Sequence, residues 1–346
     1  MKKIIIAILA IGSLALVLFG WWQGSGQYLA SADQSFGYIA AGRLAGLLAV
    51  WTVLAQVMLT SRANWLEQTF GLDRLTHFHH YNGFVVLLAI IAHGPLLAIG
   101  YGARLGQSAW REFWQLALGS DETFQAVLAV AIFILIVAVS VVIIKRHLRY
   151  ETWYAIHFLT YLAILLAFGH QLELGQDFQN SIWFSGYWIL LYVLVGAHVA
   201  VYRVIMPLYR LVRHQCTVAA VTPETASTVS IVIRGQALSR LPWRAGQFVI
   251  VRFLTKGLWY ESHPFSLSCL PNGDHLRLTV KVLGDFTKKL SRQLPIGTPV
   301  LISGPHGAFT PEQATHDQAI LIAGGIGITP LRPMAEALLG QGKKVT

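Results

Sequence analysis

Histidines occur at matched depths in two long apolar segments of the sequence. His79 and His93 are 14 residues apart in the first segment, and His157 and His170 are 13 apart in the second. On an ideal helix, 14 residues rise roughly 21 Å with a phase error of about 40°, so His79 and His93 share a face. Ionisable side chains are costly within a bilayer and usually have a function there. Two such helices can hold two stacked haems, because each helix gives one imidazole to each haem. An iron with two axial ligands suits electron transfer.

The second pair fits an ideal helix poorly. The 13 residues from His157 to His170 rise about 19.5 Å but rotate the second side chain by about 140° relative to the first. This pair therefore needs a locally distorted helix. His80 is an alternative to His79, with a worse helical phase. Packed, hydrogen-bonded core histidines are the other interpretation, and we apply it to His198, which has no partner at a matched depth.

The segments that carry these histidines belong to a chain with the composition of a membrane protein. Of its 346 residues, 55% are apolar and 12% are charged, whereas soluble domains carry about 25% charged residues. A membrane-spanning helix needs roughly 20 mostly apolar residues. Six stretches qualify as spans, and they are Ile4–Trp22, Phe36–Leu59, Phe78–Gly100, Phe124–Ile144, Tyr154–Leu172 and Trp183–Met206.

The charges between the spans predict their orientation. One side has only Arg104 and Arg111 in its loops, and the other side has many more basic residues. Basic residues favour the cytoplasm, so the N-terminus and the segment after the sixth span are predicted to be cytosolic. The net charge of +10 lies mostly beside apolar runs, which indicates contact with a lipid bilayer and not with nucleic acid. The basic residues of the predicted cytosolic side are Lys2, Lys3, Arg62, Arg74, Lys145, Arg146, Arg149, Arg203, Arg210 and Arg213.

Two stretches resemble a known family. LDRLTHFHHYNGFVVLLAIIAHGP, which begins at Leu72, resembles the third helix of the ferric reductase and NADPH oxidase superfamily. YETWYAIHFLTYLAILLAFGH, which begins at Tyr150, resembles the fifth helix. The family has the same paired spacings. The resemblance therefore implies two b-type haems, with the inner haem held by His79 and His157 and the outer haem held by His93 and His170.

The same resemblance bears on Arg43 and on the location of the protein. Arg43 lies in a GRLAG context that is similar to that of bacterial relatives. It is interpreted either as a partner of a haem propionate or as an arginine that snorkels to the membrane interface. The likeness to bacterial members implies a multi-pass protein of the bacterial inner (plasma) membrane.

After about Arg213 the sequence changes to short β-rich runs separated by Gly, Pro and Asn. These runs are Thr228–Arg234, Phe248–Phe253, Leu276–Val282 and Val300–Ser303, and they predict a small antiparallel barrel. The motifs RAGQFV, HPFSLS, LGDFT and SGPHGAF follow in the order seen in the ferredoxin-reductase-like flavin domains attached to this family. The HPFSLS motif taken alone is also compatible with an ordinary turn into a strand.

The resemblance assigns FAD-binding roles to these motifs. Phe265 stacks on the isoalloxazine ring and Ser266 approaches its N5 atom, so these two are the expected catalytic residues. His263 lies near the pyrophosphate. Gly284 and Thr287 open a helix whose backbone amides and dipole bind phosphate. The complete expected set is His263, Pro264, Phe265, Ser266, Leu267, Ser268, Gly284 and Thr287.

A glycine-rich turn near the C-terminus predicts the start of a nicotinamide-binding domain. Residues 319–323 have the pattern of a buried parallel strand, and Leu331–Leu339 has the pattern of a helix. Glycines between a strand and a helix let phosphates approach the backbone. The turn resembles the NAD(P)-binding turn of the same family, and the sequence ends where the next strand would begin, so this domain looks truncated. The expected NAD(P)H contacts are Gly324, Gly325, Gly327, Thr329 and Pro330.

The predicted protein is thus a multi-domain membrane protein. A six-helix transmembrane haem bundle (residues 1–210) precedes an antiparallel β-barrel flavin domain (211–312) and the start of an α/β nicotinamide-binding domain (313–346). The predicted activity is that of an NAD(P)H-dependent transmembrane oxidoreductase. Electrons pass from cytosolic NAD(P)H, via FAD and two haems, to an extracytoplasmic acceptor, which is ferric iron or oxygen. The alternative is a haem and flavin relay subunit that feeds a periplasmic redox partner.

Overall fold

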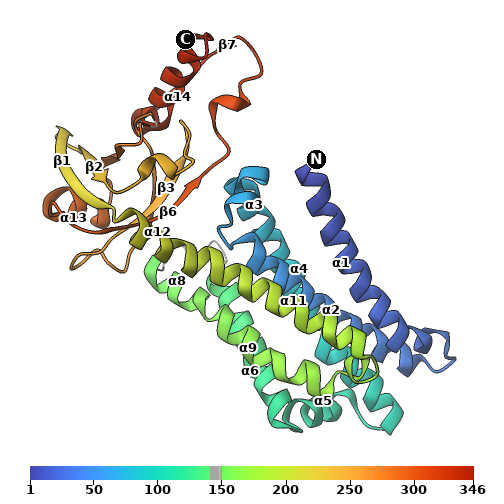
Figure 1. The fold of residues 1–346 in the computed structure, drawn as a ribbon. Helices are drawn as coiled ribbons and strands as arrows, with labels where there is room; N and C mark the ends of the chain where they lie inside the picture. The colour runs from blue at the N-terminus through green and yellow to red at the C-terminus, as the bar shows by residue number, and fades with distance from the viewer. Residues whose placement is uncertain (141–147, 149, 271) are drawn as a thin grey trace. The chain divides into compact units, whose positions relative to one another are not determined.

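The structure is a computed structural model that describes residues 1–140, 148, 150–270 and 272–346 (Figure 1). It contains two compact units. The helical unit consists of Met1–Thr60 and Thr76–Ala197, and the sheet unit consists of Ser61–Leu75 and His198–Thr346. The end of the predicted fourth span, and with it Lys145, Arg146 and Arg149, lies outside the described residues.

Six helical stretches of the described chain are long and apolar enough to cross a membrane, which confirms the six predicted spans. Asp33 caps the second stretch, because its carboxylate accepts a hydrogen bond of 2.9 Å from the Ser35 amide. The bounds are α1 (Lys2–Gly24), α2 (Gln34–Leu59), α4 (Leu72–Leu105), α6 (Asp121–Ser140), α8 (Tyr150–Phe158) with α9 (Thr160–Leu174), and α11 (Ile182–Ala200). A π-helical turn (Val201–Ile205) connects α11 to α12 (Met206–His214).

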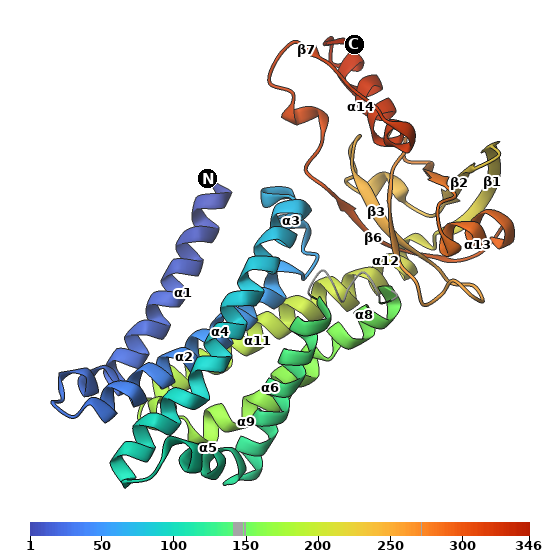
Figure 2. The same cartoon turned by 180° about the vertical axis from the view of Figure 1, so that it is seen from behind.

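Small and aromatic side chains pack the helices of the helical unit against one another. Ala129 and Phe133 of α6 lie in one buried cluster with Ala163 of α9, and the two helices run side by side (Figure 2). Phe184 and Trp188 of α11 lie in a second buried cluster. Shorter helices connect the spans, and they are η1 (Gly26–Ala30), α5 (Ala109–Leu118) and α10 (Gln176–Gln179).

The fifth span is interrupted between its two histidines. Helix α8 ends at Phe158 and α9 begins at Thr160. The amide of Leu159 donates a hydrogen bond of 3.0 Å to the carbonyl of Ile156, three residues back, which is the tighter spacing of a 3-10 turn. The hydroxyl of Thr160 donates a bond of 2.6 Å to the carbonyl of His157. The predicted local distortion of this helix is therefore confirmed.

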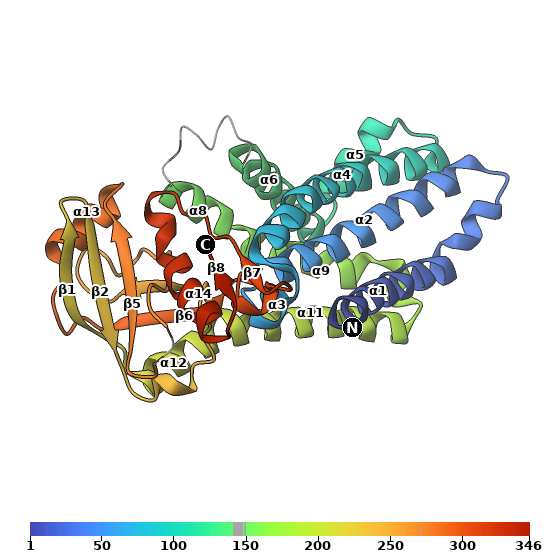
Figure 3. The same ribbon diagram turned by 90° about the horizontal axis from the view of Figure 1, so that it is seen from above.

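Two three-stranded antiparallel sheets form a small barrel in the sheet unit. Isolated bridges between Thr217 and Pro299 and between Leu267 and Leu278 join the two sheets. Figure 3 shows β1, β2 and β5 side by side. One sheet has the order β1 (Thr217–Thr225), β2 (Thr228–Arg234), β5 (His275–Lys281), and the other has the order β4 (His263–Ser266), β3 (Phe248–Phe253), β6 (Val300–His306). All four predicted strands are present, and β1 and β4 are additional.

Alternating side chains fill the barrel. In β5, Leu276, Leu278 and Val280 are buried in the core, whereas Arg277 and Thr279 are only partly buried between them. This alternation is the period of two residues that a half-buried strand requires. Each fully buried leucine or isoleucine contributes about 1.5–3 kcal/mol to the free energy of folding. Helix α13 (Asp285–Gln293) adds Phe286 and Leu290 to the same core.

The C-terminal segment has the predicted strand, turn and helix, with one correction. Strand β7 (Gln318–Ala319) pairs in parallel with β8 (Lys344–Val345), and helix α14 (Ile328–Gly340) follows the short turn η5 (Gly325–Gly327). The expectation of a buried strand over residues 319–323 is wrong in this structure. The strand is two residues long, and Ile320 and Ile322 are 76% and 87% exposed. In the described residues this sheet has two strands, and no apolar layer covers these two side chains.

Candidate haem and flavin sites

The structure brings His79 of α4 and His157 of α8 together. The centres of their rings lie 6.0 Å apart, and the ring planes make an angle of 56°. His80, the alternative to His79, is exposed and contacts the rings of Tyr81 and Phe84 instead. The geometry therefore favours His79 over His80 as the partner of His157.

A second pair consists of His93 of α4 and His170 of α9. Their ring centres lie 6.4 Å apart, with an angle of 44° between the planes. The Nδ1 atom of His93 lies 2.7 Å from the carbonyl oxygen of Gly42. A carbonyl only accepts hydrogen bonds, so Nδ1 carries the proton and Nε2 is left to bind a ligand, as is usual for histidines that bind metals. Gly46 leaves room for the ring, because an added Cβ would lie 2.7 Å from its atoms.

Both separations fit an iron atom between two imidazoles. An imidazole nitrogen lies about 2 Å from its metal and about 1 Å from the centre of its own ring, so two opposite ligands place their ring centres about 6 Å apart. The observed distances are 6.0 and 6.4 Å. Among the described residues, no three His, Cys, Asp or Glu side chains form a group that could hold a metal ion. The two pairs therefore fit a metal group that takes one histidine from each of two helices.

Polar side chains surround the His79–His157 pair. The indole of Trp153 stacks on His157, with ring centres 5.0 Å apart, and donates a hydrogen bond of 3.2 Å to the Ser140 hydroxyl. That hydroxyl lies 3.4 Å from Nδ1 of His157. The amide of Gln56 donates a bond of 2.7 Å to the carbonyl of His79. These residues were not predicted from the sequence, although the polar side chain of Gln56 within an apolar span is a signal that could have indicated one of them.

Polar residues of the helical unit hold the side chain of Arg43, and both interpretations of its role stay predictions. Its side chain is 11% exposed, and its guanidinium donates hydrogen bonds of 3.1 Å to Ser25 and 3.0 Å to Tyr101. It also contacts Gln176 and forms an ion pair of 4.0 Å with Asp177. Burial raises the pKa of the Asp177 carboxyl, and the Ser25 hydroxyl and the Arg43 charge oppose that rise. Arg43 therefore joins α2 to three other segments of the helical unit.

The HPFSLS motif forms strand β4 and the residues just after it. Val249 and Phe248 of β3 pair with Phe265 and Ser266 respectively. Phe265 is half-buried and packs against the barrel core. Pro264 is exposed and Ser266 half-buried, so both remain accessible, whereas the side chain of Leu267 is fully buried in the core. Leu267 can therefore contact a flavin only through its backbone.

His263 and the predicted phosphate-binding helix lie together. The ring of His263 stacks on that of Phe286, with centres 3.8 Å apart, and its Nε2 lies 3.1 Å from the Glu261 carboxylate. Phe286 belongs to the first turn of α13, which begins after Gly284. The amide of Gly284 donates a bond of 3.0 Å to the Thr287 hydroxyl. A Cβ added at Gly284 would meet nothing within 4 Å, so a phosphate has room to approach this backbone.

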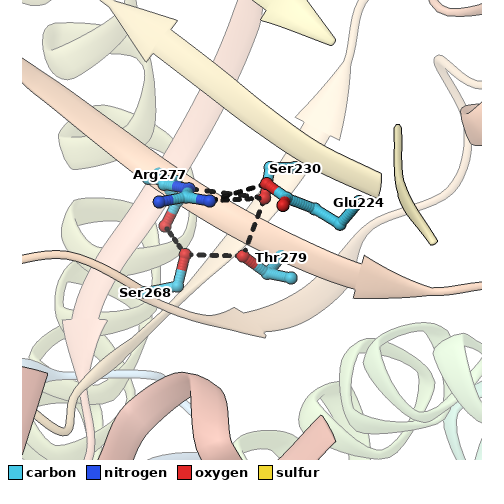
Figure 4. A network of polar contacts seen from close by, with 5 residues as sticks. All are labelled: Glu224, Ser230, Ser268, Arg277 and Thr279. Carbon is cyan, nitrogen blue, oxygen red and sulfur yellow. Dashed lines mark hydrogen bonds and ion pairs between the residues drawn. The ribbon is translucent and has the colours of Figure 1, made fainter. Parts of the chain in front are cut away.

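A polar network fixes the segment after β4 (Figure 4). The hydroxyl of Ser268 accepts a hydrogen bond of 2.9 Å from Thr279 and donates one of 3.1 Å to the carbonyl of Arg277. The guanidinium of Arg277 donates to the Ser230 hydroxyl at 3.1 Å and to the Glu224 carboxylate at 2.7 Å. Hydrogen bonding to Ser230 and to Arg277 lowers the pKa of Glu224. Ser268 therefore also joins the segment after β4 to strand β5.

The glycine-rich turn before α14 has an open backbone. A Cβ added at Gly324, Gly325 or Gly327 would meet nothing within 4 Å, and Gly325 has a φ of 53°, which favours glycine. The hydroxyl of Thr329 donates a bond of 2.9 Å to the carbonyl of Ile326 and is used within the turn. Pro330 follows in the first turn of the helix, where its missing amide hydrogen costs no hydrogen bond. These glycines fit a turn that a phosphate approaches closely.

Comparison with known protein families gives two matches along the chain. The family described as "Ferric reductase like transmembrane component" matches residues 45–168, and the family described as "FAD-binding domain" matches residues 213–324. The chain thus has a ferric-reductase-like transmembrane part followed by an FAD-binding domain. The first match contains His79, His93 and His157, and His170 lies just beyond its end.

Two of the named relatives match most of the chain. "Probable cell surface ferric reductase kap2" of Aspergillus oryzae is 23% identical over 309 residues, which cover 82% of this chain and 39% of the relative. A superoxide-generating NADPH oxidase heavy chain of Dictyostelium discoideum is 24% identical over 310 residues, which cover 80% of this chain and 57% of the relative. A flavohemoprotein of Chromobacterium violaceum is 34% identical over 111 residues, 29% of this chain and 27% of the relative. The chain thus spans about two to three fifths of the length of the first two relatives.

Proposed function

We propose that this protein transfers electrons from cytosolic NAD(P)H, through FAD and two b-type haems, to an extracytoplasmic acceptor. The acceptor is a ferric chelate or oxygen. The observation that carries the proposal is the pair of ring separations, 6.0 Å for His79 and His157 and 6.4 Å for His93 and His170. When bound, FAD accepts two electrons and releases them singly, and haem iron carries one electron at a time.

The residues of the helical unit hold and orient the haem ligands in this proposal. Gly42 fixes the tautomer of His93, and Ser140 and Trp153 restrict the ring of His157. His79 with His157, and His93 with His170, would each hold one haem. Haem iron held by two histidines would supply one-electron transfer and not binding of the acceptor at the metal.

The residues of the sheet unit bind the flavin and the donor. Phe265 offers a flat apolar face and Ser266 a hydroxyl group, and both lie on the accessible part of β4. The open backbone at Gly284, with His263 nearby, suits the pyrophosphate of FAD. The turn Gly324–Gly327 suits the phosphates of NAD(P)H. We propose with these roles that the haem domain ends at residue 210 and that the FAD-binding domain ends at residue 312.

The direction of transfer follows from the distribution of basic residues. Arg104 and Arg111 are the basic residues in the loops of one side, and the other side has many more. Since basic loops stay in the cytoplasm, the N-terminus and the flavin domain are proposed to be cytosolic in a bacterial plasma membrane. Electrons then move outward, from the His79–His157 pair to the His93–His170 pair.

Proteoliposomes test this proposal. The chain is reconstituted with haem and FAD so that the flavin faces the outside of the liposomes. Ferric citrate and an iron(II) indicator are enclosed inside. NADPH, NADH or a photochemical flavin reductant is then added outside. We expect the enclosed iron, or enclosed oxygen, to be reduced. Reduction of the haems without reduction of either acceptor would instead support a relay subunit that needs a periplasmic partner. Failure of the haems to become reduced would refute the proposal.

A further inference from the structure

A short helix in the chain between α2 and α4 packs on the flavin barrel. This helix, α3 (Asn64–Phe70), contacts strand β6, and both belong to the sheet unit. Glu67 of α3 and His306 of β6 form an ion pair, and each residue is 1% exposed. Burying an ionisable side chain is costly unless it is paired. Separation of α3 from β6 would therefore leave both a carboxylate and an imidazole without their partner.

His306 lies in the same sheet as the flavin motif. Phe248 of the central strand pairs with His306 on one side and with Ser266 on the other. The rings of His306 and Phe248 are in contact, with centres 5.5 Å apart. The Nε2 atom of His306 lies 3.2 Å from the Ser303 hydroxyl, and its Nδ1 atom faces Glu67. One strand thus separates the ion pair from the residue proposed to approach the flavin N5 atom.

The other end of α3 continues into the helix that carries an inner haem ligand. The amide of Gly71 closes α3 with a hydrogen bond of 2.8 Å to the carbonyl of Glu67, and α4 begins at Leu72. Gly71 has a φ of 85°, which favours glycine at this link. His79 follows two helical turns later in α4. The chain from Glu67 to His79 therefore consists of two helices with one non-helical residue between them.

We propose that Glu67 and His306 form a latch that holds the flavin sheet to the segment leading into α4. The latch keeps the start of α4, the helix that carries His79, attached to the flavin sheet, and so it controls the rate of electron transfer from FAD to the inner haem. This inference rests on the proposed function. Both residues are positioning residues, because they act through the sheet and through α3 and not on a reacting atom.

The variants separate a latch from an ordinary packing contact. Glu67→Ala removes the carboxylate, Glu67→Gln keeps its shape without its charge, and Glu67→Asp keeps the charge. His306→Asn removes the partner. Glu112→Gln is the matched control, because Glu112 is also buried but lies on α5 in the helical unit. All variants are made in the full chain reconstituted with haem and FAD.

The first readout does not depend on activity. Hydrogen exchange of the amides of residues 64–70 reports whether α3 stays bound to the barrel. Relative to the unaltered chain, we expect exchange to be about tenfold or more faster in Glu67→Ala and His306→Asn. In Glu67→Asp exchange should be slower than in Glu67→Ala, and in Glu112→Gln it should equal that of the unaltered chain. Equal exchange rates in the unaltered chain, Glu67→Ala and His306→Asn would overturn the latch.

The second readout is the rate at which the haems are reduced after a flash that reduces FAD. We expect this rate to fall about tenfold or more in Glu67→Ala and less in Glu67→Asp, since small misplacements have large effects on rates. The rate of FAD photoreduction should not change. Faster exchange with an unchanged haem reduction rate would overturn the positioning role. A chain that binds no haem would refute the proposed function, and the exchange measurement would still decide the latch.

Discussion

The Nδ1 atom of His93 donates a hydrogen bond of 2.7 Å to the carbonyl oxygen of Gly42. This contact joins α4 to α2 and fixes which ring nitrogen of His93 can bind a metal. His93 thus has a defined orientation toward His170 in the protein alone. The proposed outer haem would then bind to a site whose ligand is already oriented.

Gly46→Ala is expected to remove the outer haem. An added Cβ would lie 2.7 Å from the His93 ring, so the ring must move from its position opposite His170. The control is Gly37→Ala on the same helix, where a Cβ would meet nothing within 4 Å. We predict that the haem-to-protein ratio falls from about two to about one in Gly46→Ala, as expected for the loss of one of two bis-histidine sites. An unchanged ratio in Gly46→Ala would show that His93 is not a ligand.

His79→Ala is expected to remove the inner haem, whereas His80→Ala is expected to keep it. The ring of His79 lies opposite His157, but the ring of His80 contacts Tyr81 and Phe84. Haem content and the reduction potentials of the remaining haem distinguish the two variants. If His80→Ala loses a haem and His79→Ala does not, the assignment of the inner ligand is wrong.

Ser230→Ala is expected to loosen the barrel. The Ser230 hydroxyl accepts from Arg277 at 3.1 Å and lies 3.1 Å from the Thr279 hydroxyl, so its loss removes hydrogen bonds that join β2 to β5. We predict a loss of about 1–2 kcal/mol in the free energy of opening of β2 and β5, measured by hydrogen exchange of their amides. Ser227→Ala, at an exposed position beside β2, should change this free energy of opening by less than about 0.5 kcal/mol. Equal effects of the two changes would argue against the network.

Cys216 is expected to resist alkylation in the folded protein. Burial raises the pKa of its thiol to about 11 from an ordinary value of 9.0. The thiolate is the reactive form, so at pH 8 iodoacetamide should react about 100-fold more slowly than with the unfolded chain, and the rate should rise about tenfold for each pH unit toward 11. The experiment uses Cys269→Ser so that one thiol remains. A rate in the folded protein equal to that of the unfolded chain would place Cys216 at the surface.

Much of the fold was predictable from the sequence because its patterns are strong. The six spans follow from apolar length, and strands such as Thr228–Arg234 and Phe248–Phe253 follow from β-branched and aromatic runs. Strand β4 was not predicted, because it has four residues and Pro264 within it. The break at Leu159 was required by the histidine spacing, although its position was not predictable from that spacing.

The contacts between distant segments could not be predicted. Nothing in the sequence near Glu67 indicates that it meets His306, more than two hundred residues later. The same is true of Arg43 and Asp177, and of Gly42 and the ring of His93. Each contact depends on how the helices and strands pack in three dimensions, and a single sequence does not contain that information in a local pattern.

The most direct test of the two proposed haem sites is the haem content and absorbance spectrum of the full chain, purified after haem supplementation. We predict two b-type haems per chain, both six-coordinate and low-spin in the oxidised and reduced states, as expected if each iron has two histidine ligands. In the variant that combines His79→Ala with His93→Ala, both haems should be absent. A protein without haem, or with five-coordinate high-spin haem that persists in this variant, would show that these histidines do not hold two haems.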